Sequence, residues 1–523
     1  MADQHQVFQL SIDRVMKTDS IVIVGGGSSG WMTAATLIKL FPSKKITLIE
    51  SKNYKIVGVG ESTLGTINQW LSLLKIKDKD FLPYTDGSYK LSIRFEDFYR
   101  KDESFHYPFG LPYEDNLWSG KNTWYFKKML KRNTMVSNYA NFLYPQMQLV
   151  KYNRIGRNKD GELGNFSFAN DTAYHFDATK FGQWLKEKIC IPEGVEHIID
   201  DIESVEQDEN GIVSLNNKYK ADLYIDCTGF KSLLLGENLK VPFKSYENLL
   251  PNNSAWATRI PYEDKEKQLV PYTNCKAVEN GWIWTIPSWN RIGTGYVYSD
   301  KYISDEDALA QFKKHLGKED IEANNIKMRI GMHEKIFVKN VVAIGLSAGF
   351  IEPLESNGLF TVHEFLIELA RTLKRPNVNQ LDRDEFNHCC KGTFDRFAEF
   401  VAVHYYMSAR DDTQYWRDLT NKSIAKEKMG SYDIERLIEH KNNYNYYSET
   451  GLQCIATGMY RFPTDDIALA AENYLKEKTT DWLIDKYGKD ITERERAIKR
   501  WKEVALTKPK LIDVLTKIHA KRD

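Results

Sequence analysis

The residue pattern with the clearest chemical meaning lies at residues 21–50. A short β-branched run leads into Gly25-x-Gly27-x-x-Gly30, and a second apolar run ends in Glu50. Gly25 permits a tight turn, Gly27 lets the backbone approach a pyrophosphate, and Gly30 lets helix and strand pack closely. Glu50 can accept hydrogen bonds from ribose hydroxyls. The spacing predicts a dinucleotide site, with a glycine-rich turn that binds nothing as the alternative.

A second glycine-rich stretch favours FAD over NAD as the dinucleotide. The sequence VGVGEST at 57–63 follows shortly after Glu50 and gives the backbone another close approach to a large cofactor. A flavin, which has a ring system to seat, needs such a stretch more often than a nicotinamide does. We therefore expect an FAD site.

The elements expected around these glycines form an α/β protein with a Rossmann-like FAD-binding fold. A helix is expected at 31–41, and Asp177 is a candidate N-cap for another amphipathic helix. Residues 341–369 again read as strand, glycine turn and helix, which would bring a second helix N-terminus to the cofactor. The β-rich residues 241–300 predict an antiparallel sheet over the substrate side.

These elements suggest three regions along the chain. We expect an N-terminal extension at 1–20, an FAD-binding body at 21–380 that contains the inserted sheet at about 241–300, and a largely helical region at 381–523. The scattered charges at the N-terminus lack the apolar core of a signal peptide.

Composition excludes several classes of protein. The 523 residues carry 72 Lys and Arg against 72 Asp and Glu, a zero balance that argues against a basic nucleic-acid binder. We find no apolar run of about 18 residues, so we expect no membrane span. The six cysteines form no CxxC pair, which favours reduced thiols in a cytoplasmic protein and no metal site. The aromatic residues, 13% of the chain, suit a large core and a pocket for flat ligands.

Longer motifs make the sequence similar to a known family. They include GGGSSGWMTA (25–34), GVGEST (58–63), AYHFDA (173–178), ADLYIDCTGF (221–230), GWIWTIP (281–287), AIGLSAGFIEPLESNG (343–358) and SARDDTQYW (408–416). The chain resembles the flavin-dependent halogenases of the tryptophan-halogenase type. GWxWxIP together with EPLES is far more specific than the glycine fingerprint.

The resemblance implies an activity, its cofactors and its partners. Reduced FAD, supplied by a separate reductase, would use oxygen to oxidise a chloride or bromide ion to hypohalous acid, which then halogenates a small electron-rich aromatic such as an indole or phenol. A homo-oligomer is compatible with the family. The resemblance also implies flavin contacts at Gly26, Ser29, Ser51, Val59, Gly60, Ser62, Ile198, Leu346 and Leu359.

The family pattern assigns roles to two short segments. Lys90, in DGSYKLSIRF, matches the lysine that holds or captures hypohalous acid; without the resemblance, a lysine on a surface strand would be the simpler interpretation. Glu355 matches the carboxylate that orients the oxidant and accepts the ring proton, and Ser356 has a supporting role. Asn357, where the family usually has Thr, and Gly358 match backbone amides that bind halide.

The substrate side both agrees with the family and departs from it. Trp282 and Trp284 match a pair that separates flavin from substrate, and Phe109 is retained in the pocket wall. Tyr107 stands where tryptophan halogenases have His. Leu452, after Gly451, replaces part of an aromatic pair. We therefore expect that free tryptophan is not the native substrate.

Two other functions share parts of this pattern. A single-component flavin-dependent aromatic hydroxylase has the same fold, but it lacks GWxWxIP and carries an acidic turn where this chain has Gly345-Leu346-Ser347. A non-catalytic flavoprotein is the other alternative, and the presence of both Lys90 and Glu355 argues against it.

Overall fold

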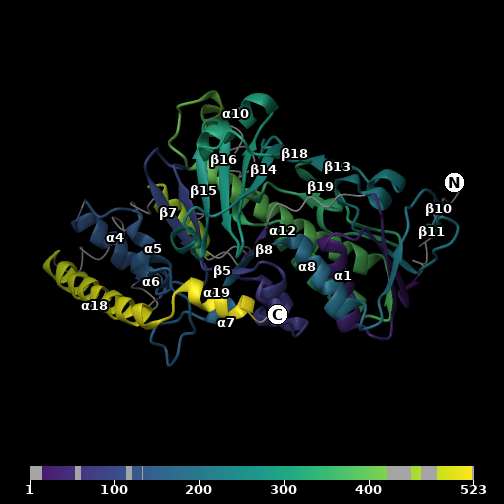
Figure 1. Cartoon of the computed structure of the whole chain (residues 1–523), viewed down its shortest axis with the longest axis horizontal. Helices are drawn as coiled ribbons and strands as arrows, with labels where there is room; N and C mark the ends of the chain where they lie inside the picture. The colour runs from purple at the N-terminus through teal and green to yellow at the C-terminus, as the bar shows by residue number, and fades with distance from the viewer. Residues whose placement is uncertain are drawn as a thin grey trace, which may run out of the picture.

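The computed structural model describes residues 15–53, 61–113, 120–131, 133–420, 449–460 and 480–520. Figure 1 shows three parts along the longest axis of the molecule. Helices α1 (Ser28–Leu40) and α8 (Ala178–Leu185) lie toward one end, and a large sheet lies near the middle. Helices α4 (Gly120–Leu130), α5 (Asn138–Leu143), α6 (Met147–Lys151) and α18 (Thr480–Thr507) form the other end.

A six-stranded sheet forms the centre of the predicted FAD-binding body. Its order is β20 (Phe337–Val338), β21 (Val341–Ala343), β12 (Leu223–Asp226), β2 (Ser20–Val24), β3 (Lys45–Glu50) and β9 (Glu196–Ile199). All neighbours pair in parallel except β20 with β21. The Asp177 side chain accepts from the Lys180 amide at 3.1 Å and caps α8. The α/β fold class and this N-cap are confirmed.

The second large sheet has seven strands and extends beyond the predicted range of 241–300. Its order is β18 (Asn324–Lys327), β14 (Ser254–Ile260), β17 (Ile292–Tyr298), β16 (Gly281–Pro287), β15 (Tyr272–Val278), β6 (Ser92–Glu96) and β7 (Ser104–Pro108). The predicted antiparallel strands are present. The parallel pairing of β15 with β6 joins them to a hairpin far earlier in the chain, which a local pattern cannot indicate.

A small three-stranded sheet changes the expected geometry around Lys90. It consists of β4 (Glu61–Ser62), β8 (Ala173–Phe176) and β5 (Ser88–Lys90). The stretch 86–95 alternates enough to suggest a single strand, but it divides at Leu91: β5 pairs with β8, whereas β6 belongs to the seven-stranded sheet. Lys90 therefore ends a strand at the junction of two sheets.

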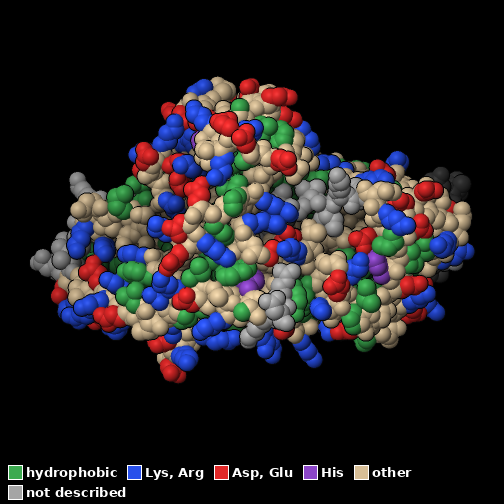
Figure 2. All heavy atoms as spheres, viewed as in Figure 1, with side chains coloured by type: hydrophobic (Ala, Val, Ile, Leu, Met, Phe, Trp, Pro, Cys, Tyr) green, Lys and Arg blue, Asp and Glu red, His purple; other side chains and the backbone are tan. Residues whose placement is uncertain are grey.

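Short strands and helices complete the described structure. The remaining strand pairs are β1 (Met16–Lys17) with β23 (Asn377–Val378), β10 (Val205–Asp208) with β11 (Gly211–Leu215), and β19 (Gly331–His333) between β13 (Phe243–Ser245) and β22 (Gly349–Phe350). The remaining helices that concern the site are α10 (Asp305–Leu316), α11 (Phe360–Leu373), α12 (Gln380–Tyr406), α13 (Gln414–Thr420), α16 (Glu449–Gly458) and α19 (Leu511–His519). Within the described ranges, no helix is both long and apolar enough to cross a bilayer. Figure 2 shows acidic and basic side chains interspersed on the viewed face.

Candidate active site

A cavity of about 720 Å³ lies where the two large sheets meet. The carboxyl ends of the parallel strands line one side of it, which is the usual ligand position in an open α/β sheet. Alternate residues of β15 and β16 line the other side. The cavity is lined by nine residues of the predicted flavin site, Gly25, Gly26, Gly27, Ser29, Glu50, Ser51, Ser62, Leu346 and Leu359.

Two residues predicted to contact the flavin stand apart from this lining. Gly30 lies in the first turn of α1, and Ile198 lies on β9 beside Ile49. Neither lines the cavity. Val59 and Gly60 fall outside the described residues.

The glycine turn before α1 fits a dinucleotide. Gly25 has φ +116°, and a Cβ there would collide with the carbonyl oxygen of Cys227; a Cβ at Gly30 would collide with the carbonyl of Gly25. A Cβ at Gly27 meets no heavy atom within 4 Å, because this residue faces the cavity. Gly25 and Gly30 allow close packing, and Gly27 leaves the backbone open to a ligand, as FAD requires. Glu50 faces the same cavity.

Trp282 and Trp284 form the sheet-side wall of the cavity. Their ring centroids lie 6.1 Å apart, and both side chains are buried. The Trp282 Nε1 donates to Glu352 Oε2 at 3.1 Å, and the same carboxylate oxygen accepts from Asn252 Nδ2 at 2.6 Å and from the Tyr405 hydroxyl at 2.9 Å. Burial raises the pKa of Glu352. This polar cluster fixes the orientation of the Trp282 indole.

Lys90 is 0% exposed and has an unusual environment for an ammonium group. Its Nζ donates to the Thr63 carbonyl at 2.9 Å and to Ser356 Oγ at 2.8 Å, and it lies 4.9 Å from the centroid of the Phe109 ring. Burial lowers the pKa of Lys90 to about 7, although the charge of Glu355 partly offsets this. A lysine with such a pKa can donate a proton near neutral pH.

The segment 352–358 forms a tight turn between the cavity and Lys90. Ser356 has a left-handed backbone, φ +61° and ψ +36°, lines the cavity and donates from its Oγ to Ser62 Oγ at 3.1 Å. The Asn357 side chain donates to the Ile351 carbonyl at 2.9 Å, which holds the turn closed. Gly358 also lines the cavity, just before α11. The two residues predicted to bind halide thus lie next to Ser356.

Glu355 is buried and bonded to a residue that the sequence did not single out. Its Oε1 lies 2.7 Å from His404 Nε2, and both side chains are at most 1% exposed. The His404 Nδ1 lies 3.0 Å from the Phe400 carbonyl, an acceptor, so this nitrogen carries a hydrogen. The contact with Glu355 therefore holds a second proton between Nε2 and Oε1. Among the described residues, Glu355 Oε2 has no hydrogen-bond partner.

Aromatic and small residues form a wall beside Lys90. Tyr107 and Phe109 meet edge to face, with ring centroids 5.9 Å apart. Across from them lies α16, where a Cβ at Gly451 would come within 2.8 Å of the Tyr107 hydroxyl oxygen. Leu452 is buried on the same helix. Tyr107 thus takes the space that a larger side chain at position 451 would need.

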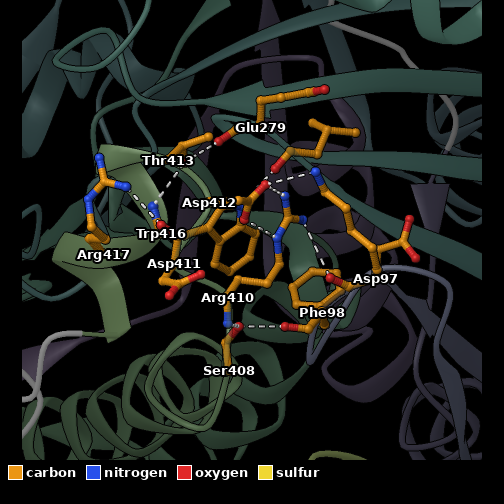
Figure 3. Close-up of polar contacts among 12 residues, drawn as sticks. Asp97, Phe98, Glu279, Ser408, Arg410, Asp411, Asp412, Thr413, Trp416 and Arg417 are labelled. Atoms are coloured by element: carbon orange, nitrogen blue, oxygen red, sulfur yellow. Dashed lines mark hydrogen bonds and ion pairs between the residues drawn. The ribbon is translucent and has the colours of Figure 1, made fainter.

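The motif SARDDTQYW at 408–416 ties the end of α12 to the seven-stranded sheet (Figure 3). Arg410 forms a two-pronged pair with Asp412, at 2.9 and 2.8 Å, and lies 4.5 Å from the centroid of the Trp416 ring. Ser408 donates to the Phe98 carbonyl at 2.6 Å, and Trp416 donates to the Val278 carbonyl at 2.7 Å. Because α12 carries His404, this clasp (residues 408–416) helps to position the Glu355 pair.

Sequence reasoning missed three buried polar residues near the site. Glu352 and Glu355 both lie in EPLES, but only Glu355 matched a residue to which the family pattern assigns a role. His404 stands in the apolar segment AVHYY that precedes the recognised SARDDTQYW motif. His175 lies in the recognised stretch AYHFDA. In each case a histidine or acid in a mainly apolar, family-like segment was the available signal.

The two sheets, the glycine turn and the tryptophan-lined cavity fit a flavin-dependent oxidoreductase. Comparisons with known proteins show the family to which it belongs. Residues 20–472 match the family model described as tryptophan halogenase. The chain is 36% identical to the 7-chloro-L-tryptophan 6-halogenase KtzR of Kutzneria sp. (strain 744) over 464 residues, 82% of this chain and 87% of the relative.

Solved structures agree with this family match. A structure described as apo VirX1 is 40% identical, with a TM-score of 0.86 over 96% of this chain and 99% of its own. The tryptophan 6-halogenase SttH of Streptomyces toxytricini is 31% identical, with a TM-score of 0.81 over 96% of this chain and 100% of its own. The chain belongs to the tryptophan halogenase family. It is a flavin-dependent halogenase, an oxidoreductase that uses reduced FAD.

The family match also bears on the expected substrate. The curated relatives KtzR and SttH are named as halogenases of tryptophan or a chlorinated tryptophan. The expectation that free tryptophan is not the native substrate has no support in these relatives, and it stays a prediction that rests on Tyr107 and Leu452.

Proposed function

We propose that this halogenase places hypohalous acid beside Lys90 and transfers its halogen to a small electron-rich aromatic. A separate reductase would deliver the reduced FAD, which the glycine turn and the tryptophan wall hold. When bound, reduced FAD and oxygen supply the oxidising power that turns a halide ion into hypohalous acid. We assign the halide to the backbone of Asn357 and Gly358, beside the cavity.

Lys90 and Glu355 have complementary roles in the transfer. A Lys90 N–H donates to the oxygen of hypohalous acid and makes the halogen more electrophilic. An electron pair of the aromatic ring forms the carbon–halogen bond while the oxygen–halogen pair stays on oxygen, which takes a proton from Lys90 and leaves as water. Glu355, held by His404, accepts the proton that the ring carbon loses.

One observation carries this proposal: Ser356 connects Lys90 to the cavity. Ser356 lines the cavity on one side, and on the other its Oγ accepts from Lys90 Nζ at 2.8 Å. The lysine is therefore one hydrogen bond from the space that would hold the flavin. Trp282 and Trp284 line that space too, and we assign them the role of separating the flavin from the substrate.

The test is a halogenation assay with an external flavin reductase, FAD, oxygen, chloride or bromide, and product detection by mass spectrometry. We expect halogenated indoles or phenols from the wild type, no halogenation from Lys90→Met, and unchanged FAD affinity in that variant. A hydroxylated product without halogen would contradict the proposal, as would normal halogenation by Lys90→Met.

The substrate panel must include free tryptophan beside indole, phenols and larger tryptophan derivatives. We propose an aromatic that lacks the amino acid group, because Tyr107 packs against Gly451 and Leu452 supplies an aliphatic wall. Efficient conversion of tryptophan to one regioisomer would refute this part and leave the role of Lys90 intact.

A further inference from the structure

Lys90 is one end of a continuous buried hydrogen-bonded path. The path runs from Lys90 Nζ through Ser356 Oγ, Ser62 Oγ, Thr273 Oγ1 and the His175 ring to Ser88 Oγ, with successive distances of 2.8, 3.1, 2.8, 2.9 and 3.4 Å. Each of these side chains is at most 5% exposed. We call the three central hydroxyls, those of Ser356, Ser62 and Thr273, the hydroxyl chain.

The small sheet brings the ends of this path together. Strand β8 lies between β4 and β5, so His175 pairs directly with Ser62 on one side and with Ser88 on the other. Directly paired residues project from the same face of a sheet. Lys90 follows Ser88 by two positions and shares that face.

The direction of the hydrogen bonds is fixed from the His175 end. Ser88 donates its one hydroxyl hydrogen to the Pro287 carbonyl at 2.7 Å, because a carbonyl only accepts. The Ser88 oxygen and the same carbonyl are then acceptors for His175 Nδ1, which must carry the ring hydrogen. Burial, and next the charge of Lys90, hold the pKa of His175 well below its usual range, so the ring is neutral and Nε2 is an acceptor.

A bare Nε2 orients all three hydroxyls in one direction. Thr273 must donate to His175, so Thr273 accepts from Ser62. Ser62 in turn accepts from Ser356, whose oxygen is then left to accept from Lys90. Each hydroxyl has one hydrogen to donate, so no other arrangement satisfies the whole path while His175 is neutral.

We propose that His175 is a positioning residue for Lys90. Through the hydroxyl chain it fixes Ser356 as an acceptor and so holds the lysine as a donor. Two of the three N–H groups are then bonded to Thr63 and Ser356, and the third is directed to hypohalous acid. This inference rests on the proposed role of Lys90.

Protonation of His175 would reverse the path. An imidazolium Nε2–H would donate to Thr273, and each hydroxyl would turn until Ser356 donated to Lys90, which could accept only as a neutral amine. The other titratable groups that act on Lys90 are Glu355 and Cys275. Neither group belongs to the path, so variants of the path residues test the path separately from the effects of Glu355 and Cys275.

The test combines three variants with a matched control. Thr273→Val removes the central hydroxyl at nearly constant volume, and His175→Phe removes Nε2. In His175→Gln, the amide oxygen can still accept from Thr273. The control is Thr258→Val, a buried threonine of β14 whose hydroxyl donates to the Glu322 carbonyl at 2.6 Å and which does not line the cavity.

We expect Thr273→Val and His175→Phe to lower kcat roughly a hundredfold, the effect of a misdirected catalytic group, with little change in KM. His175→Gln should recover most of the loss, and Thr258→Val should match the wild type. If Lys90→Met is inactive but Thr273→Val and His175→Phe behave like Thr258→Val, this inference fails and the role of Lys90 stands. If Lys90→Met halogenates normally, the proposed function itself fails.

A measurement without turnover checks the orientation directly. ¹⁵N NMR of the full chain labelled in histidine, with the His175 signals assigned by their loss in His175→Gln, should show a neutral ring with hydrogen on Nδ1. The Nε2 signal should move in Thr273→Val. A hydrogen on Nε2 in the wild type would overturn the proposal, even if His175→Phe does not fold.

Discussion

Replacement of Lys90 by Met should make the protein more stable while it abolishes halogenation. The buried ammonium is unfavourable for folding, since burial lowers the pKa of Lys90 from 10.5 to about 7. This lowering of the pKa corresponds to about 5 kcal/mol of destabilisation when the lysine is charged in both states. Met has a similar length and carries no charge. It leaves the Thr63 carbonyl and Ser356 hydroxyl without their donor, which costs about 1–3 kcal/mol. We therefore expect a net gain of about 2–4 kcal/mol at pH 6.

The pH dependence of this gain has a definite sign. Below pH 7 the lysine is charged in the native and unfolded states, so the full destabilisation is present. Between pH 7 and 10.5 the native lysine is mainly neutral while the unfolded one is still protonated, so the wild type becomes more stable relative to Lys90→Met as pH rises. From pH 7 to 9 the gain should shrink by about 2 kcal/mol, because the native lysine is already half deprotonated at pH 7.

Urea unfolding at pH 6, 7, 8 and 9, followed by both tryptophan fluorescence and circular dichroism, measures this difference. Lys276→Met is the control: Lys276 is partly exposed, and its hydrogen bond to Glu96 raises its pKa, so its loss should destabilise the protein. A Lys90→Met variant that is less stable than wild type at pH 6, with a difference that stays constant to pH 9, would refute the reasoning.

Three further predictions concern the parts around the lysine. Pairing with Arg410 lowers the pKa of Asp412 to about 2. The ion pair therefore stabilises the fold fully above pH 4, and this stabilisation is lost as pH falls through 2. The urea midpoint of Asp412→Asn should approach that of the wild type only in this acid range. His404→Phe should lower kcat far more than His404→Gln, because only Gln can still donate to Glu355; equal rates in steady-state assays would speak against the pair. Gly25→Ala should lose FAD binding in a fluorescence titration, because the new Cβ collides with backbone; retained affinity would contradict the fit.

The parts of the fold that sequence could predict are those specified by neighbouring residues. The strand, glycine turn and helix around Gly25 follow from local spacing, and so does the Asp177 cap. The division of the lysine strand at Leu91 does not, because β6 leaves its neighbour to pair with β15, about 180 residues later in the chain. The alternation of residue types across 86–95 is the same whether these residues form one strand or two strands in different sheets.

The hydrogen-bond partners of the site residues could not be predicted from neighbouring sequence for the same reason. Lys90 meets Ser356 across 266 positions, and Glu355 meets His404 across 49. A lone histidine in an apolar helix predicts burial, but its partner is set by how α12 crosses the turn. Resemblance could indicate Lys90 and Glu355, since they match a family motif, yet it gave no contact for His175 or His404.

The turn at 352–358 explains how two separate requirements are met by one short segment. The side chain of Glu352 holds Trp282 in the cavity wall, and Glu355, three residues later, is bonded to His404. Ser356 then bonds Lys90, and it does so from a left-handed backbone that costs a non-glycine residue roughly 1–2 kcal/mol. Hydrogen bonds on both sides of the Ser356 hydroxyl offset that strain. Because one short turn bonds both the cavity wall and the lysine, the backbone of that turn limits the distance between them.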